Sequence, residues 1–484
     1  MTSIRRARFV RLALAIAILG LFVPPVALAQ EKHALYESIA SQADEGWDAA
    51  LKIWGWAEPG YQEVQSSKLL AELLEAEGFA VERGVAGMPT AFVATYGEGT
   101  PVVGILGEFD ALPGLSQDAV PERSPREVGG YGHGCGHHLF GVASALAARA
   151  VAEQIAAGHV QGTIRFYACP AEEGGAAKTF MVRDGLFDDC DVALHWHPSN
   201  RNAAGDTSCL SRVAAKFRFH GTSAHAASAP EQGRSSLDAV ELMNHAAQLL
   251  REHTPDFTRI HHVITAGGGA PNVVPDFAEV YYYVRHPNSE VVRGVYDRLV
   301  KCAEAGALAT ETRLEIEYLG GTAEIVPNHV LSSLVQNNLR ARNQLQMDDD
   351  ERAFAMRIQN TLANPTPLET IAHVVDTTGD TGKGSTDVGD VSWAVPTTGF
   401  STACWVPGTP AHSWQATAAG GTTLGRQGML LAAEVLAATS WDLMREPARI
   451  ESAKQEHAGR VGDRYRTLLE TDQQPPLDYR DAAR

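Results

Sequence analysis

The sequence predicts an α/β fold in which a three-layer α/β domain is interrupted by a smaller ferredoxin-like α+β unit. Short apolar runs alternate with helical patterns through the first 208 residues, and a β-α-β-β-α-β order follows between residues 209 and 326. At 484 residues the chain is long enough for two hydrophobic cores. Candidate metal ligands occur on both sides of the second unit, which indicates that it is an insertion.

The first domain is predicted from hydrophobic periodicity. Apolar residues at helical spacing predict helices at residues 35–56 and 66–77, and small residues predict a third helix at 139–156. Four apolar runs predict strands, at residues 91–96, 102–106, 163–169 and 192–196. We expect this domain to comprise residues 30–208 and to resume at residues 327–450.

The inserted unit is expected at residues 209–326. Its six elements are predicted as a strand at 212–219, a helix at 235–253, strands at 260–266 and 277–284, a helix at 289–308 and a strand at 313–318. The acidic run at residues 348–350 is expected to begin a helix rather than to bind metal. Residues 451–484 are charged and are expected to form a partly ordered tail.

Residues 1–29 have the features of a signal peptide. Arginines precede an apolar run at residues 12–23, and Ala27 and Ala29 form an A-x-A cleavage signal. We therefore expect an exported protein, periplasmic or secreted. The apolar run is short for a membrane span and no later segment is expected to reach the required length, so no stable membrane insertion is expected.

The net charge of -18 argues against a nucleic-acid partner. Six cysteines are too few for a disulfide scaffold in an exported chain of this length, although one or two bridges are compatible with the sequence.

The chemistry is most evident at residues 132–138, where one thiol and three imidazoles lie between glycines. Cys135 and His137 stand two apart in a loop before a predicted helix, a place that suits metal ligands with short side chains. The helix dipole there also favours a thiolate. This loop predicts half of a metal site.

Acidic and imidazole side chains supply the other half. Glu172 and Glu173 follow a predicted strand and point in different directions in extended backbone, so one can bind a metal while the other acts as general base. Either His195 or His197 can be a ligand at the next strand end, with His197 preferred because it lies at the turn. His412 is a further candidate, and together these residues indicate a hydrolase that uses metal-activated water.

Five motifs resemble the amidohydrolase branch of the aminoacylase/carboxypeptidase metallopeptidases. They are residues 107–113, 134–137, 170–174, 223–226 and 408–412. The resemblance covers roughly residues 35 to 445. It implies a metallopeptidase-like catalytic domain and identifies the inserted unit as a lid and dimerisation domain.

The resemblance also implies roles for individual residues. Two divalent ions, Mn(II) or Zn(II), would be bound by Cys135, His137, Glu173, His197 and His412. Glu172 would be the general base and Asp110 an acid that orients the site. His225 and Asn272 of the lid would act in the partner subunit's site, His225 on the oxyanion and Asn272 on the substrate. His138 departs from the pattern, because many relatives carry Asp there.

The expected reaction is cleavage of the amide bond of an N-acyl amino acid, with p-aminobenzoyl-glutamate as the leading substrate. Arg234 or Arg285 would hold the substrate carboxylate. A broader N-acyl-amino-acid amidohydrolase or a dipeptidase is an alternative with the same site, and a non-catalytic metal-binding partner subunit is an alternative of another class. The protein is expected to be a homodimer or to pair with a similar subunit.

Overall fold

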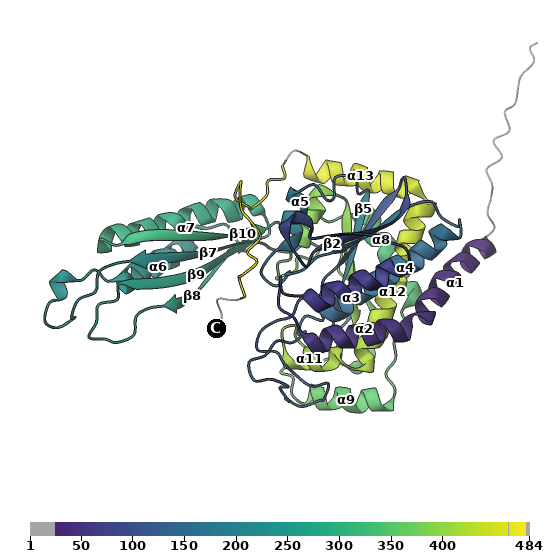
Figure 1. The fold of residues 1–484 in the computed structure, drawn as a ribbon, viewed down its shortest axis with the longest axis horizontal. Helices are drawn as coiled ribbons and strands as arrows, with labels where there is room; N and C mark the ends of the chain where they lie inside the picture. Colours follow the sequence, from purple (N-terminus) through teal and green to yellow (C-terminus); the bar gives the residue numbers. More distant parts are fainter. Residues whose placement is uncertain (1–24, 463, 481–484) are drawn as a thin grey trace, which may run out of the picture.

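The computed structural model describes residues 25–462 and 464–480, and these form two sheets with their own helices (Figure 1). The larger sheet has eight strands in the order β1-β2-β4-β3-β5-β12-β6-β11. The smaller sheet has four, in the order β10-β7-β9-β8, and extends to one side of the molecule. The predicted combination of a three-layer α/β domain with an inserted α+β unit is confirmed.

Four parallel strands form the centre of the larger sheet, and they are β4, β3, β5 and β12 in spatial order. Successive residues along them, such as Ile105 and Leu106, belong to cores on opposite faces of the sheet. The strands of this sheet are β1 (Ala80–Arg83), β2 (Phe92–Glu98), β3 (Val102–Gly107), β4 (Gly162–Ala168), β5 (Val192–Ser199), β6 (Asn202–Ala204), β11 (Val374–Asp376) and β12 (Thr397–Ala403).

Helices cover both faces of this sheet. The main core lies between the sheet and helices α4 and α12, and a second core lies under α5 and α10. The helices of this domain are α1 (Pro25–Ser41), α2 (Ala43–Trp56), α3 (Val64–Glu75), α4 (His137–Ala156), α5 (Ala177–Arg183), α8 (His329–Arg342), α9 (Asp349–Gln359), α10 (Val388–Ala394), α11 (Trp414–Gly420), α12 (Thr423–Arg445) and α13 (Pro447–Val461).

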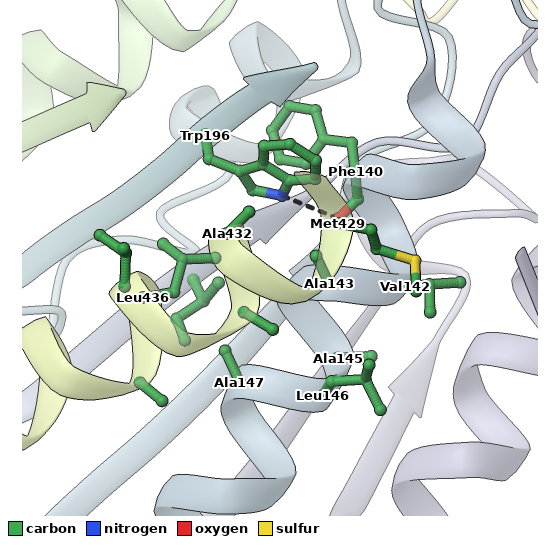
Figure 2. Close-up of a cluster of buried hydrophobic side chains, with 14 of the residues drawn as sticks. Phe140, Val142, Ala143, Ala145, Leu146, Ala147, Trp196, Met429, Ala432 and Leu436 are labelled. Carbon is green, nitrogen blue, oxygen red and sulfur yellow. Dashed lines mark hydrogen bonds between the residues drawn. The ribbon is translucent and has the colours of Figure 1, made fainter. Parts of the chain in front are cut away.

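Helix α4 lies at the centre of the main core. Its alanines allow α12 to approach closely, and Met429 and Leu436 of α12 lie in the same cluster (Figure 2). The indole N–H of Trp196 on β5 donates to the Phe140 carbonyl at 3.2 Å, so a hydrogen bond also ties the start of α4 to the sheet. This packing fixes the helix whose N-terminus carries His137.

Among the described helices, α4 is the one that is long and apolar enough to cross a membrane. The expectation that no segment after the N-terminal run reaches this length is therefore wrong. Because 83% of that stretch is buried inside the fold, α4 has the character of a core helix.

The smaller sheet is entirely antiparallel, with helices packed on one face. Its elements are β7 (Ser211–His220), α6 (Ser236–Leu250), β8 (Arg259–Ala266), β9 (Phe277–His286), α7 (Ser289–Thr310) and β10 (Arg313–Thr322). This is the predicted β-α-β-β-α-β order, and each predicted element is present with its ends shifted by a few residues. We refer to residues 211–322 as the lid.

The C-terminal residues differ from the expected tail. After α13 the chain returns to the lid, where Leu468 is 1% exposed within the lid core and its carbonyl accepts a hydrogen bond from the Tyr318 hydroxyl at 2.7 Å. The segment then continues towards the larger domain and ends its described part at Arg480 (Figure 1). Charged residues alternate here with a few apolar residues, and the segment is held on the lid by the burial of Leu468 and by hydrogen bonds to its backbone carbonyls.

The first 24 residues, with most of the expected signal peptide, lie outside the described part of the chain. Residues 35–56 form two helices, α1 and α2, instead of one. The acidic run begins α9, where the Asp348 side chain accepts from the Glu351 N–H and Glu351 bonds back, as a capping box does. All six cysteines are unpaired thiols.

Candidate metal centre and active site

The candidate site lies where the parallel strands of the larger sheet end. Asp110 follows β3, Glu173 follows β4, His197 is near the end of β5 and His412 lies in the loop after β12. Carboxyl ends of neighbouring parallel strands lie along one edge of a sheet, so residues far apart in the sequence converge there. The topology therefore assembles the site from four separate connections.

Cys135, His137 and His197 form a first group, with ligand atoms within 4.8 Å of one another. Gly136 adopts a φ of +78° between the first two residues, which lets the chain turn from the loop into α4. The Cys135 Sγ lies 3.3 Å from the Nε2 of His197. A short loop, a helix start and a strand end thus place a thiol and two imidazoles together.

Cys135, Glu173 and His412 form a second group of the same kind. The Nε2 of His412 lies 3.1 Å from Glu173 Oε1. His412 has a φ of +55°, and Ala171, just before the glutamates, has a φ of +54°. Such conformations are costly for residues with a Cβ and are found where a site requires them.

Neighbouring groups orient these side chains. Asp110 Oδ1 lies 2.8 Å from His137 Nδ1, and its Oδ2 accepts the Glu173 backbone N–H at 3.0 Å. His197 donates from Nδ1 to the Pro198 carbonyl at 2.7 Å, so Nε2, the nitrogen that faces Cys135 Sγ, is the one available to a metal. Hydrogen bonds that fix the far ring nitrogen are a general feature of histidines that bind metals.

The donor set fits divalent transition ions. Thiolate, imidazole and carboxylate are the ligands of zinc, and a mixed set of this kind also admits manganese. Burial, and then the charge of Glu173, raises the pKa of the Cys135 thiol. A bound dication is what ionises a thiol in such surroundings. Both groups contain Cys135, so this thiol could serve either ion position.

Glu172 lies beside this centre, in a group with His137 and Glu108. Burial is the main cause that raises its pKa, followed by the charges of Glu108 and Glu173. A carboxyl group with a raised pKa accepts a proton readily near neutral pH, as general acid–base chemistry requires. Glu172 is therefore a candidate proton acceptor beside the two ligand groups.

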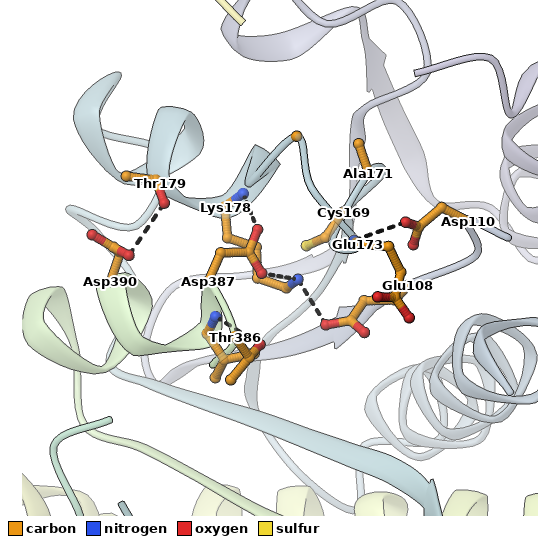
Figure 3. A network of polar contacts seen from close by, with 12 residues as sticks. Glu108, Asp110, Cys169, Ala171, Glu173, Lys178, Thr179, Thr386, Asp387 and Asp390 are labelled. Atoms are coloured by element: carbon orange, nitrogen blue, oxygen red, sulfur yellow. Dashed lines mark hydrogen bonds and ion pairs between the residues drawn. The ribbon is translucent and has the colours of Figure 1, made fainter. Parts of the chain in front are cut away.

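A buried ion network supports the acidic side of the site (Figure 3). The ammonium of Lys178 lies 2.7 Å from Glu108 Oε1 and 2.7 Å from Asp387 Oδ1, and all three side chains are almost inaccessible to solvent. The other oxygen of Glu108 lies 3.2 Å from His137 Nε2. Glu108 thus connects the lysine to the first ligand group. Lys178 was not predicted, since a lone lysine in a short helix carries no local signal.

Several of the predicted residues belong to neither ligand group. His195 faces the cavity but packs on β12, where a Cβ added to Gly399 would lie 2.2 Å from its ring, so the geometry favours His197. Arg234 is paired with Glu311 at 2.6 Å and does not line the cavity. His225 and Asn272 are exposed on the lid, away from Glu172 of the same chain.

The site opens into a cavity of about 790 Å³ between the larger domain and the base of the lid. Arg285, predicted to bind the substrate, lines it, with its Nη1 3.4 Å from the Ser385 hydroxyl. Arg212 and Arg480 also line it, and neither was predicted from the sequence. Arg480 reaches the cavity from the C-terminal segment, where its Nη2 donates to the Glu173 carbonyl at 3.0 Å.

Known proteins are similar to this chain in sequence and in fold. The Peptidase dimerisation domain profile matches residues 211–311, which lie in the lid. The chain is 39% identical over 449 residues to a subunit of the p-aminobenzoyl-glutamate hydrolase of Escherichia coli, covering 87% of this chain and 93% of the relative. It is 31% identical to the Xaa-Arg dipeptidase of Mus musculus, over 90% of this chain and 94% of the relative.

Solved structures show the same fold at low identity. An aminobenzoyl-glutamate utilization protein from Klebsiella pneumoniae matches with a TM-score of 0.61 and 18% identity, over 84% of this chain and 98% of that one. A dinuclear metal binding peptidase of the M20 family from Bacillus subtilis matches with a TM-score of 0.57 and 18% identity, over 84% and 99%. The chain belongs to the M20 family of metallopeptidase-like amidohydrolases.

Proposed function

We propose that the protein hydrolyses the amide bond of an N-acyl amino acid, with two divalent ions bound by Cys135, His137, Glu173, His197 and His412. The observation that carries this proposal is the pair of ligand groups joined through Cys135, with Glu172 beside them at the floor of a cavity. A protein that only bound metal would need the ligands but not the adjacent base. The donor set supports zinc or manganese.

The ions, when bound, would polarise the substrate carbonyl and acidify the attacking water. Glu172 takes the proton from that water and returns it to the leaving amine. Asp110 holds His137 in position through its 2.8 Å contact, and the Lys178 ammonium, 2.7 Å from Glu108 Oε1, balances the charge of that carboxylate. The products are a carboxylic acid and a free amino acid.

We further propose that the active form is a dimer, either of two copies or with a similar subunit. The dimerisation domain profile supports this, as does the position of His225. His225 Nδ1 accepts the backbone N–H groups of Ala227 and Ser228, each at 3.2 Å. Its Nε2 then carries the proton of a neutral ring, and this exposed donor suits an oxyanion in another subunit's site.

Asn272 supports the same arrangement, because its carbonyl accepts the Ala226 N–H at 3.0 Å and so places it next to His225. The leading substrate is p-aminobenzoyl-glutamate, on the strength of the Escherichia coli relative. We also propose export to the periplasm or beyond, because residues 1–29 have the charge, apolar run and cleavage signal of a signal peptide.

The test is hydrolysis of p-aminobenzoyl-glutamate by purified protein that has been stripped of metal and reloaded with Mn(II) or Zn(II). Release of glutamate and p-aminobenzoate that depends on the metal is the expected result. Protein that binds two ions per chain but releases neither product from this or other N-acyl amino acids would contradict the proposal. Cys135→Ser is the matched variant, and we expect it to lower the metal content of both positions.

A further inference from the structure

One face of strand β7 carries three cations with unequal surroundings. Arg212, Lys216 and Arg218 alternate along the strand and therefore share a face. Arg218 pairs with Glu279 at 2.6 Å and with two glutamates of β10, and Lys216 lies 3.9 Å from Glu317. Among the described residues, no carboxylate pairs with Arg212. The unpaired cation is the one that lines the active-site cavity.

Arg212 also lies beside a second cation without an acidic partner. It is directly opposite Arg285 on β9, and both guanidinium groups lie over the Tyr283 ring, at 4.8 and 5.5 Å from its centroid. Like charges directly opposite each other destabilise a sheet. Burial, and then the charge of Arg212, lowers the pKa of Arg285. Within the part of the chain that the structure describes, Arg212 and Arg285 are therefore two positive charges at the cavity wall without a carboxylate partner.

The C-terminal segment brings a third guanidinium to the same cavity. Arg480 lines it and is held by the Glu173 carbonyl and by the Tyr479 ring, 4.7 Å away. The Nε atoms of Arg212, Arg285 and Arg480 are all buried without a hydrogen-bond partner. So is the hydroxyl of Thr322, the β10 residue paired with Arg212. Buried donors without partners are rare in native proteins and call for an explanation.

An anionic ligand explains this cluster. The acidic residues of the cavity, Glu108, Glu172, Glu173 and Asp387, belong to the metal centre and its ion network. Arg212, Arg285 and Arg480 line the part of the cavity wall that the lid and the C-terminal segment form. Guanidinium groups bind carboxylates in pairs of parallel hydrogen bonds. One arginine suffices for the α-carboxylate of an amino acid, which leaves a second positive position.

We propose that Arg212, assisted by Arg480, binds a second carboxylate of the substrate while Arg285 binds the first. The substrate class is then N-acyl dicarboxylic amino acids, and the C-terminal segment is part of the binding site. This inference rests on the proposed amidohydrolase function for the orientation of the substrate, with its amide at the metal centre. A substrate with a cationic side chain would face like charge in the same position.

The test compares p-aminobenzoyl-glutamate with p-aminobenzoyl-glutamine, which has the same shape but no side-chain charge. The metal-loaded enzyme is expected to prefer the glutamate derivative. In Arg212→Gln the ratio of the two kcat/KM values should fall by about 10- to 100-fold, the size of a lost charge-assisted contact. Arg212→Lys should restore part of the ratio, and Arg480→Gln should lower it by a smaller factor.

Arg218→Gln is the matched control, because it removes an arginine from the same strand face outside the cavity and should keep the wild-type ratio. An unchanged ratio in Arg212→Gln, with the variant folded as judged by its Tm, would overturn the inference.

A binding measurement separates this inference from the proposed function. Titration calorimetry on the metal-loaded Glu172→Gln protein gives the Kd of each derivative without turnover. Preference for the glutamate derivative that disappears in Glu172→Gln/Arg212→Gln supports the subsite even if the wild-type protein hydrolyses neither compound. Equal Kd values in the Glu172→Gln protein would refute the subsite even if hydrolysis is observed.

Discussion

Glu172 is the residue on which the proposed chemistry depends most directly. Because the proposed role of Glu172 is to move a proton and not to bind a metal ion, Glu172→Gln should keep the metal content of the wild-type protein. Its kcat should fall by about 10²- to 10⁴-fold, the usual contribution of general acid–base catalysis. Metal analysis and steady-state kinetics on the same preparation check both halves of this prediction. Wild-type turnover in the variant would remove Glu172 from the mechanism.

Lys178 shows how a single buried charge supports the site. Its ammonium is the shared partner of Glu108 and Asp387, so Lys178→Met leaves two buried carboxylates without a cation. Breaking a buried ion pair in this way costs about 3–5 kcal/mol. Urea denaturation should show this loss in the free energy of unfolding. A loss below about 1 kcal/mol would mean that the carboxylates find other partners or protons.

These residues also show what the sequence could and could not predict about the site. Cys135 and His137 stand in a short glycine-flanked loop and Glu172 follows an apolar strand, so their chemistry is visible locally. Lys178 and Arg212 have no such local signal in the sequence. Their surroundings come from Asp387 and Arg285, which lie about 200 and 70 residues further along the chain. Arg480 falls in a charged segment whose composition predicts a tail.

Helix α7 offers a matched test of packing at the scale of an element. A Cβ added at Gly306 would lie 2.7 Å from the Ala239 carbonyl of α6, whereas nothing lies within 4 Å of a Cβ added at Gly294. Gly306→Ala should therefore push the two lid helices apart and cost about 1–3 kcal/mol. Gly294→Ala should be neutral or stabilise the helix by up to about 1 kcal/mol.

Urea denaturation of the two variants measures both free energies of unfolding. Equal stability in the two variants would show that α6 and α7 do not pack as described. The prediction depends on backbone contact, since the nearest atom at Gly306 belongs to the α6 main chain and cannot rotate away.

Elements were predictable where periodicity or an apolar run was long. Strands β3, β4 and β5 and all six lid elements were found from the sequence for this reason. Strands β6 and β11 have three residues each, too few for any alternation to be visible. The C-terminal segment was expected to be partly ordered because of its charge, but Leu468 alone places a side chain in the lid core. Leu468 acts together with the hydrogen bonds of Tyr465 and Arg480, and such tertiary contacts can order a segment whose composition predicts a tail.

Asp390 connects several parts of the whole molecule. On α10, it accepts hydrogen bonds from Thr179 of α5, from the Ala323 N–H just after the lid and from the Tyr465 hydroxyl of the C-terminal segment. Burial raises its pKa to about 7. The folded protein keeps this proton up to about pH 7, whereas the unfolded chain releases it near its ordinary pKa of about 4.

Between about pH 4 and pH 7, unfolding therefore releases the proton of Asp390. The contribution of Asp390 to the free energy of unfolding falls as the pH rises through this range. We expect the free energy of unfolding of the wild-type protein, minus that of Asp390→Asn, to fall over this pH range and to be constant above it. Urea denaturation at a series of pH values measures this difference. A difference independent of pH would contradict the raised pKa.

The assembly as a whole is tested by mixing two inactive variants. If His225 acts in the partner's site, Glu172→Gln lacks the base and His225→Ala lacks the oxyanion donor, and each homodimer should be inactive. Refolding or subunit exchange of an equal mixture makes half of the dimers hybrid, and each hybrid has one intact site. The mixture should recover about a quarter of wild-type activity, as expected for a twofold dimer.

The double variant Glu172→Gln/His225→Ala, mixed with the wild-type protein, is the control, because its hybrids contain no intact site. If instead His225 served its own chain, mixing the two single variants would restore nothing. The exposure of His225 on the lid, outside the cavity of its own chain, is the structural reason to expect recovery.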